Sequence, residues 1–250
     1  MRWIERMAGR MADLFEFPQK LARRAGGFGV VLALFLTAAS TLSAQAPPVV
    51  PPRSVVVLDA AHGGDDSGAI LGSQPEKAYT LALSVRLRSL LAARGFQVVT
   101  TRESDIAVEP DRRAEIANHA KAMACLSLHA TEAGSGVHIF VSSLAPQDDA
   151  RFLPWKTAQA AWVTRSLALA GVLNSALQHA GIGVTLGRIG MPAMDSMTCP
   201  AVAVEVAPER TPDMPGGESL DDPGAQARVA EALAAALLEW RSTDKGAREP

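Results

Sequence analysis

The sequence predicts an α/β fold: a single three-layer domain with a mostly parallel central sheet flanked by helices. Three observations carry this prediction. Apolar, β-branched runs typical of buried strands alternate with segments of helical periodicity. The segments between strands are long enough for the crossovers that parallel strands require. The 250 residues, 48% of them apolar, can also bury one full core. We therefore expect residues 54–241 to form one folded domain.

The first expected strand is Val55–Leu58, a continuous apolar run of the kind that is buried on both faces of a sheet. An amphipathic helix over Glu76–Arg94 follows, with leucines at helical spacing, and Gly95 ends it. The later expected elements, in chain order, are a strand over Phe96–Thr101, a helix over Asp111–Lys121, strands over Met123–Leu128 and Val137–Ser142, a helix over Thr157–Ala180, a strand over Ala201–Val206 and a helix over Ala225–Trp240.

Residues 1–46 have the layout of an export leader. Lys20, Arg23 and Arg24 precede a charge-free apolar segment, residues 26–46, that ends in small residues. This layout fits either a signal peptide, modestly favoured, or an uncleaved membrane anchor. In both cases the domain is exported and works in the periplasm or cell envelope. A proline-rich linker over residues 47–53 and a disordered tail over 242–250 are expected to flank the domain.

Charge and cysteine content narrow the function classes. A formal net charge of -2 gives no electrostatic case for a nucleic-acid partner. Cys125 and Cys199 lie in apolar runs and not in C-x-x-C pairs, which excludes a cysteine zinc finger and a disulfide scaffold. A single disulfide between them is possible in an oxidising compartment, but two separate buried thiols are favoured.

Polar residues just past the strand ends are the candidates for chemistry, because ligands of open α/β sheets collect outside the carboxyl ends of the strands. Two histidines and a carboxylate with one open position are the ligand set of a catalytic zinc ion, and a further carboxylate would act as general base. The candidates are Asp59 and His62 after the first strand, Glu76 at the start of the first long helix, Arg102 and Asp105 after the second strand, His129 after the third and Glu205 in the late strand.

Each candidate also has a plain structural explanation. His62 alone would more often cap a turn, and Glu76 alone would be a helix N-terminal carboxylate favoured by the macrodipole. His129 follows an apolar run, where a buried imidazole needs a partner. Glu205 lies in AVAVEVAP, where a carboxylate is costly unless it has a function or a counter-ion. Taken together, these residues favour a metal site.

Seven short motifs occur in order between residues 54 and 240. They are LDAAHGGDDSGA at 58–69, E-K at 76–77, T-R-x-x-D at 101–105, R-x-x-x-A-N at 113–118, S-x-H-A at 127–130, G-V-x-x-F at 136–140 and C-P-A-V-x-x-E at 199–205. In this order they resemble the zinc-dependent N-acetylmuramoyl-L-alanine amidases of the type 3 family, which are bacterial cell-wall amidases.

The resemblance implies one Zn²⁺ ion held by His62, Glu76 and His129, with Glu205 as the catalytic base. The implied reaction is hydrolysis of the amide bond between N-acetylmuramic acid and L-alanine in peptidoglycan. Zinc would polarise the carbonyl and lower the pKa of water. Asp59 is expected to orient one of the metal-binding histidines by a hydrogen bond, without itself binding the metal.

Departures from the family pattern are also present. Ala60 and Ala61 replace the family's Pro-Gly before His62, so the loop carrying this histidine is expected to be set differently. The loop over residues 206–209 lacks the usual glycine and aromatic, so substrate preference is expected to diverge. Residues 144–156 are too few for the regulatory helix of some relatives, which predicts an open site.

Two alternatives remain open. The chain could be a catalytically weak or inactive homologue that binds peptidoglycan or a regulatory protein, or a zinc peptidase acting on another amide of the stem peptide. The sequence identifies no regulatory partner and suggests membrane contact only through an uncleaved N-terminal segment. The remaining polar candidates are read as structural, namely His119, His138 and His179, with His138 facing solvent, and Asp65 and Asp66 as turn residues.

Overall fold

The computed structural model describes residues 54–147 and 153–246. The expected leader (1–46), the linker (47–53) and the last tail residues (247–250) lie outside the described residues, so their assignments stay predictions. None of the helices in the described ranges is long and apolar enough to cross a membrane.

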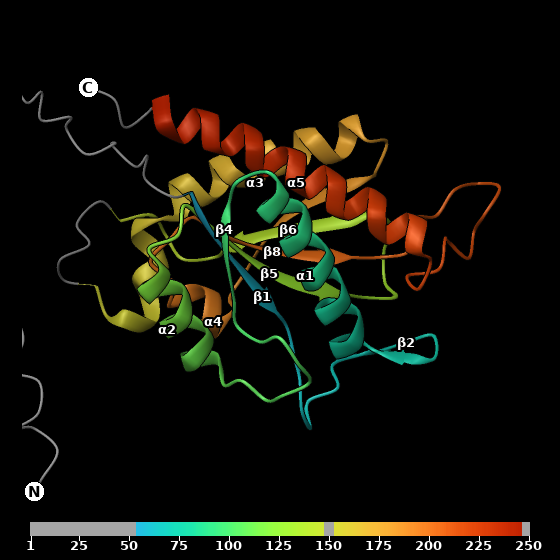
Figure 1. Cartoon of the computed structure of the whole chain (residues 1–250), viewed down its shortest axis with the longest axis horizontal. Helices are drawn as coiled ribbons and strands as arrows, with labels where there is room; N and C mark the ends of the chain where they lie inside the picture. The colour runs from blue at the N-terminus through green and yellow to red at the C-terminus, as the bar shows by residue number, and fades with distance from the viewer. Residues whose placement is uncertain (1–53, 148–152, 247–250) are drawn as a thin grey trace, which may run out of the picture. The chain divides into compact units, whose positions relative to one another are not determined.

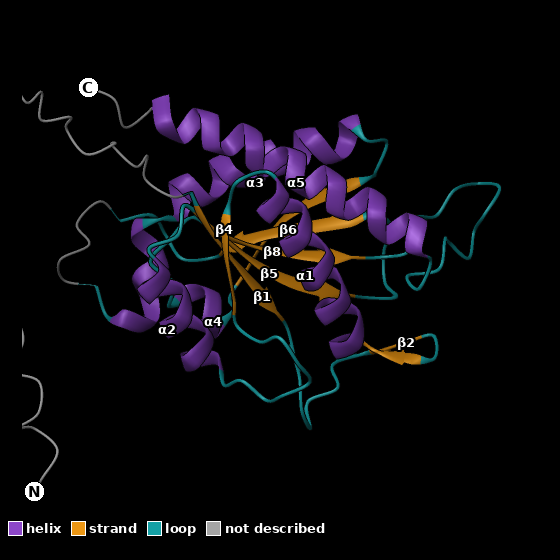
Figure 2. Ribbon diagram, viewed as in Figure 1, coloured by secondary structure: helices purple, strands orange, loops and turns teal. Residues whose placement is uncertain are grey.

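Six strands form one sheet in the order β4-β1-β5-β8-β6-β7 (Figures 1 and 2). The strands β4, β1, β5 and β8 run parallel, β6 is antiparallel to β8, and β7 is parallel to β6. The predicted mostly parallel sheet flanked by helices is therefore confirmed. The strand bounds are β1 Val55–Ala60, β4 Gln97–Thr100, β5 Ala124–Ala130, β6 Val137–Ser142, β7 Val184–Ile189 and β8 Ala201–Val206.

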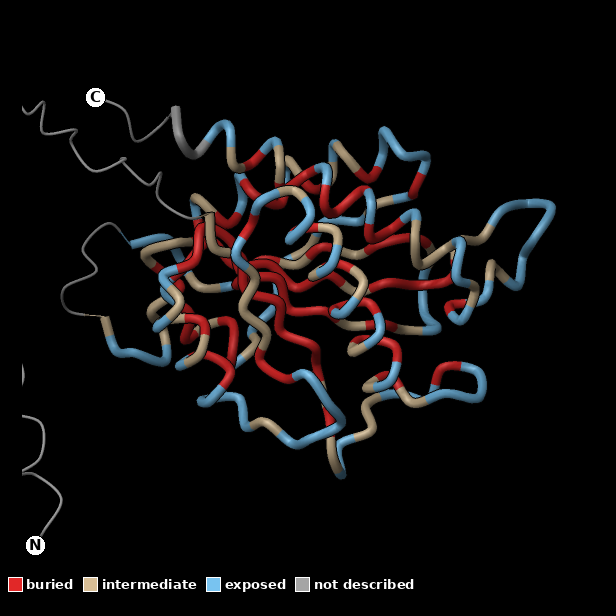
Figure 3. The backbone as a smooth tube through the Cα atoms, in the orientation of Figure 1, coloured by how far each residue is buried: buried red, intermediate tan, exposed pale blue. Residues whose placement is uncertain are grey.

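Helices cover both faces of the sheet (Figure 1). The long helices α1 (Glu76–Ala93), α3 (Val163–His179) and α5 (Pro223–Gly246) pack their leucines on one face, in the larger core cluster. The short helices α2 (Pro110–Ala120) and α4 (Pro192–Asp195) contribute to a smaller cluster on the other face. The central strands β1, β5 and β8 are almost wholly buried between these layers (Figure 3).

Strand alternation decides which side chains share a face. In β1, Val56 belongs to the core under α1, α3 and α5, whereas Val57 belongs to the core beside α2 and α4. Val57 pairs with Cys125 and Asp59 with Ser127, so all four lie on the α2 and α4 face. His129 lies two residues after Ser127 on β5, so its side chain faces the same way, as does that of its register partner Glu205. The candidate residues on strands therefore share one face at the carboxyl ends of β5 and β8.

Several elements differ from those expected. The predicted helix over 157–180 is divided into the 3-10 helix η2 (Trp155–Ala161) and α3. The edge strand β7 was not predicted, because its sequence VTLGRI mixes polar residues and glycine and is mostly exposed. The hairpin of β2 (Ile70–Leu71) and β3 (Gln74–Pro75) and the four-residue α4 are too short for a periodic signal. The last helix extends to Gly246, beyond the expected end at Trp240.

The expectation of two separate thiols is wrong, because Cys125 and Cys199 form a disulfide. Cys125 lies in β5 and pairs in register with Ala201 of the neighbouring strand β8. Cys199 precedes Ala201 by two residues and therefore keeps the same facing. The two Cα atoms lie 6.3 Å apart, within bonding range. Only the adjacency of β5 and β8, which the sequence does not specify, brings the two cysteines together.

Candidate metal centre

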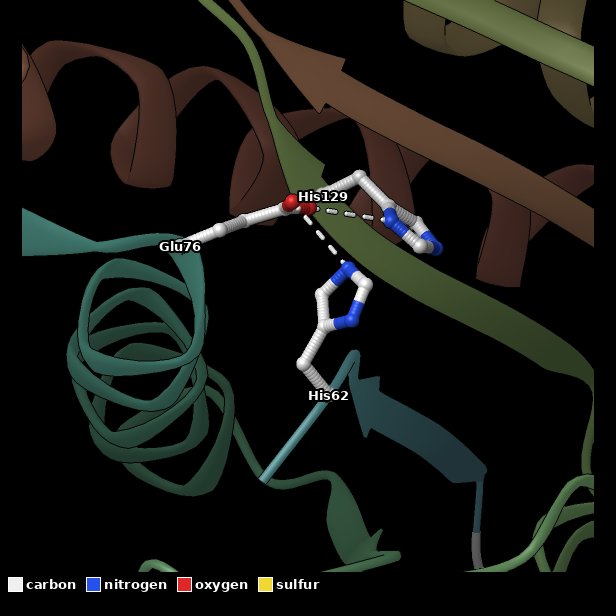
Figure 4. A group of neighbouring side chains, drawn as sticks. All are labelled: His62, Glu76 and His129. Atoms are coloured by element: carbon white, nitrogen blue, oxygen red, sulfur yellow. Dashed lines mark hydrogen bonds and ion pairs between the residues drawn. The ribbon is translucent and has the colours of Figure 1, made fainter. Parts of the chain in front are cut away.

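Three residues from separate elements converge at the carboxyl edge of the sheet. His62 lies in the loop after β1, Glu76 is the first residue of α1, and His129 is on β5. One ligand atom from each lies within 4.8 Å of the other two. The Glu76 carboxylate sits between the rings, with Oε2 3.1 Å from His62 Nε2 and Oε1 3.1 Å from His129 Nδ1 (Figure 4). The structure thus assembles all three predicted metal-ligating residues.

Glu76 is the buried centre of this group, with 5% of its surface exposed. Its carboxylate also accepts hydrogen bonds from the backbone amides of Ala69 and Ala130, each 3.1 Å long. Burial raises the pKa of the Glu76 carboxyl, but the hydrogen bonds from His129, His62 and the two amides outweigh it and hold the pKa below its ordinary value. Glu76 is therefore an anion that α1, β5 and the His62 loop all fix in place.

His62 has a carboxylate at each ring nitrogen. Its Nδ1 lies 2.8 Å from Asp66 Oδ2, while Nε2 faces Glu76. The hydrogen bond with Glu76, followed by that with Asp66, raises the pKa of the imidazole above its ordinary value. The bond to His62 in turn holds the pKa of Asp66 low. A proton on Nδ1, donated to Asp66, would leave Nε2 as the nitrogen that could bind a metal ion.

Asp66 is a turn residue, as read from the sequence, because its Oδ1 accepts a hydrogen bond from the Gly68 amide and its backbone pairs with Gly63. Its Oδ2 is in addition the partner of His62, which the sequence reading missed. The signal was its position four residues after His62 in a glycine-rich loop, which lets the chain fold back on the ring. The loop itself is tight, because His62 has a φ of 61°, in the left-handed region that non-glycine residues seldom adopt.

Two arginines hold this loop by its carbonyl groups. Arg113 donates to the carbonyl oxygens of Ala60 (2.7 Å) and His62 (2.8 Å). Arg102 donates to those of Ala60 and Ala61, both at 2.9 Å. The two guanidinium groups thus fix the backbone of the turn, and the expected difference in its setting at Ala60 and Ala61 stays a prediction.

Asp59 does not contact a histidine directly. Its carboxylate accepts hydrogen bonds from Thr101 Oγ1 (2.7 Å), Arg113 Nη1 (2.7 Å) and Ser127 Oγ (2.8 Å). The Ser127 hydroxyl lies 3.4 Å from Nε2 of His129. Asp59 therefore acts on His129 only through Ser127, which can accept the Nε2 proton and leave Nδ1 for a metal ion.

Asp105 also holds the loop that carries His62. Its carboxylate accepts from the amide of Gly64 (2.8 Å) and pairs with Lys77 Nζ (2.8 Å). The hydrogen bond from Lys77 is the main reason why the pKa of Asp105 lies below its ordinary value. Both Arg102 and Asp105 thus support the His62 loop and do not enter the group of three.

Glu205, the predicted base, lies on β8 directly opposite His129 in the strand register. Adjacent strands are about 4.8 Å apart. The side chain keeps 31% of its surface exposed, and its Oε2 lies 2.9 Å from Nδ1 of His138. The reading of His138 as a solvent-facing residue is wrong: β6 runs antiparallel to β8 and turns this histidine onto the face that carries Glu205.

A cavity of about 240 Å³ opens beside the group of three. His62 and His129 line it, and their side chains are 23% and 21% exposed, so both rings are partly open to solvent. The lining also includes Glu109 and the apolar residues Ala107, Val108, Pro110, Met191, Pro192 and Ala193. The site therefore combines polar ligands with a wall that can hold an uncharged part of a substrate.

The donor set fits a zinc ion. Zinc is bound by imidazole nitrogen and carboxylate oxygen, and catalytic zinc sites use three protein ligands with one open position. The chain supplies two imidazoles and one buried carboxylate, each ring has a partner that fixes its proton, and the cavity leaves the open side.

Comparison with known proteins identifies the family of the chain. A family model described as N-acetylmuramoyl-L-alanine amidase matches residues 56–239. The germination-specific N-acetylmuramoyl-L-alanine amidase of Bacillus subtilis (strain 168) is 32% identical over 118 residues, which are 41% of this chain and 50% of that protein. The amidase AmiC of Neisseria meningitidis serogroup B is 32% identical over 108 residues, 40% of this chain and 26% of that protein. The match thus spans half or less of the length of these relatives.

Solved structures show the same fold. The catalytic domain of CwlV, an N-acetylmuramoyl-L-alanine amidase from Bacillus (Paenibacillus) polymyxa var. colistinus, has a TM-score of 0.59 and 28% identity. The alignment covers 76% of this chain and 98% of that chain. AmiC2 of Nostoc punctiforme has a TM-score of 0.57 and 27% identity, over 75% of this chain and 97% of that one.

Proposed function

Because the chain belongs to the N-acetylmuramoyl-L-alanine amidase family, whose model matches residues 56–239, we propose that residues 54–241 are a zinc-dependent catalytic domain. The proposed reaction is hydrolysis of the amide bond between N-acetylmuramic acid and L-alanine in peptidoglycan. The single observation that carries the proposal is the convergence of His62, Glu76 and His129, with Glu205 on the neighbouring strand.

In this proposal His62, Glu76 and His129 hold the metal ion through Nε2, the carboxylate and Nδ1. The bound zinc supplies a Lewis acid that polarises a carbonyl group and lowers the pKa of water. Asp66 and Ser127 fix the proton on the outer nitrogen of each imidazole, so that both rings present a lone pair to the site.

Glu205 is proposed as the general base. Its carboxylate takes a proton from the attacking water and returns it to the amine nitrogen that leaves when the amide bond breaks. A partly exposed carboxylate at the sheet edge suits this exchange, because water and substrate can reach it. The apolar lining residues Ala107, Val108, Pro110 and Met191 to Ala193 would hold the substrate against the ligands.

The location follows from the substrate. Peptidoglycan lies outside the cytoplasm, so we propose that residues 1–46 export the domain, as a signal peptide or an anchor, to the periplasm or cell envelope. The disulfide supports this proposal, because disulfides persist in oxidising compartments.

Digestion of purified peptidoglycan by the full chain tests the function. An amidase leaves a free lactyl carboxylate on the sugar and releases an intact stem peptide, both of which mass spectrometry identifies. Cleavage inside the peptide would identify a peptidase, and binding without products would identify an inactive homologue. Either result would overturn the proposal.

Variants test the division of roles. Glu205→Ala should keep zinc and lose about 10²–10⁴-fold in kcat, the usual contribution of a general base. His62→Ala and His129→Ala should lose the metal itself, measured by elemental analysis. Glu239→Ala, on the exposed side of α5, is the matched control and should behave as the wild type. Equal metal loss in the Glu205 and histidine variants would refute the assignment.

A further inference from the structure

We propose that His138 is a positioning residue that holds the Glu205 carboxylate in its working orientation. The inference rests on the proposed function, because it assigns His138 a role through the carboxylate proposed as general base.

The strand register places His138 beside Glu205. His129 on β5 pairs with Glu205 on β8, and Glu205 pairs with His138 on β6. The three side chains therefore form one row across three neighbouring strands, on one face of the sheet. The metal ligand lies on one side of Glu205 and His138 on the other.

The contact between His138 and Glu205 has a defined direction. Nδ1 of His138 lies 2.9 Å from Oε2 of Glu205. An ionised carboxylate only accepts hydrogen bonds, so Nδ1 carries the proton and donates it. Within residues 54–147 and 153–246, no other group hydrogen-bonds to this carboxylate. Oε2 is thus held while Oε1 stays available to receive a proton.

The ring of His138 is itself held by its surroundings. Gly134 has a φ of 80°, and a Cβ atom at this position would lie 2.4 Å from both Cε1 and Nε2 of His138. The backbone at Gly134 can therefore pack against the ring only because it carries no side chain. Phe140 contacts the ring edge-on with centroids 6.3 Å apart. The His138 side chain is 14% exposed, less than half the 31% of Glu205.

The contact with His138 restricts the side-chain rotamers of Glu205. A glutamate has three rotatable side-chain bonds, and a partly exposed one loses its working position in most rotamers. A fixed donor selects the rotamer before substrate binds, which is the pre-organisation on which proton transfer depends. A histidine fixed by Gly134 and Phe140 provides such a donor.

Two substitutions separate hydrogen bonding from packing. His138→Phe keeps the ring beside Gly134 and Phe140 but removes the donor. His138→Asn removes the ring but can place an amide N–H near the position of Nδ1. Both are made in the full chain and compared in zinc content, kcat and KM on peptidoglycan fragments.

If His138 positions Glu205, His138→Phe should lower kcat by about 10- to 100-fold with zinc content and KM little changed. His138→Asn should recover most of that loss. A kcat of His138→Phe equal to that of the wild type would overturn the inference in favour of packing. A kcat of His138→Asn below that of His138→Phe would do the same, because it would show that the ring and not the donor matters.

A double-mutant cycle adds a test that a structural role would not pass. In the Glu205→Ala background His138→Phe should cause no further loss of residual activity, because the group it positions is gone. If His138→Phe lowered kcat by the same factor in the Glu205→Ala background as in the wild type, the inference would be overturned. An inactive wild type would instead refute the proposed function, whereas an active wild type with a damaged Glu205→Ala variant and an unaffected His138→Phe variant would refute this inference alone.

Discussion

At the scale of single residues, the candidate metal centre depends on groups behind the ligands. Glu76 is fixed by two backbone amides, His62 by Asp66, and His129 by Ser127, which Asp59 holds in turn. Each partner determines which ring nitrogen keeps its proton. If the three residues bind a metal ion as proposed, these hydrogen bonds would hold the ligands in place around it.

Substitution of Asp66 should weaken metal binding. Asp66→Ala removes the partner of His62 Nδ1, and loss of such a partner typically costs about 10- to 100-fold in metal affinity. Competition with a chelator of known affinity measures the change. Asp65→Ala is the matched control, because Asp65 is an exposed neighbour in the same loop. Equal weakening by both substitutions would show that loop charge, and not the bond to His62, matters.

The raised pKa of His62 predicts how pH acts on the metal-free protein. Because the folded-state pKa lies above the ordinary 6.5, the stability that His62 contributes is full below 6.5 and is lost as pH rises through the folded value. Urea unfolding of chelator-treated wild type and His62→Ala should therefore differ most at acidic pH, where Glu76 remains ionised. A difference that grows toward alkaline pH would contradict this sign.

At the scale of elements, the loop after β1 is held by side chains from elsewhere. Arg113 comes from α2 and Arg102 from the segment after β4, and together they bind the carbonyl groups of three consecutive residues, 60–62. Arg113 also pairs with the buried Asp59 at 2.7 Å. The position of His62 thus depends on how α2 packs against β1.

Removal of Arg113 should damage both stability and the site. Arg113→Met leaves Asp59 buried without its charge partner, and breaking such a pair costs about 3–5 kcal/mol. Asp59 keeps its bonds from Thr101 and Ser127, so the lower end of this range is expected in urea unfolding. Zinc affinity should fall as well, because the His62 carbonyl loses its donor.

The neighbouring arginine provides the control for this prediction. Arg112 pairs with Glu115 on the exposed side of α2, where ion pairs contribute about 0–1 kcal/mol. Arg112→Met should therefore change neither quantity much. Similar losses in both variants would point to helix charge and not to the buried pair.

At the scale of the whole molecule, β5 and β8 connect the site to the core. The disulfide joins the starts of these two strands, and His129 and Glu205 stand at their ends. The bond links residues 74 positions apart in sequence, so it restricts a large part of the unfolded chain. The strand pair that aligns ligand and base is thereby also the covalently joined pair.

Loss of the disulfide should lower stability more than activity. Cys125→Ala combined with Cys199→Ala should reduce the free energy of unfolding by about 2–5 kcal/mol, as loop-closing disulfides generally do. Under conditions where the variant remains folded, zinc content should match the wild type, because no ligand is altered. Unchanged stability, together with two alkylatable thiols in the unfolded wild type, would show that the bond does not form.

The sequence by itself determined the fold class and the three ligand candidates, because buried strands, amphipathic helices and polar residues past strand ends are local patterns. It also marked Glu205, since a carboxylate in an apolar strand is costly without a function. The tertiary structure alone decided the order of strands in the sheet and which residues face each other across it. The disulfide and the pairing of His138 with Glu205 both depend on that arrangement. Strand order and loop path bring together residues distant in the chain, and no periodicity within a single segment encodes such contacts.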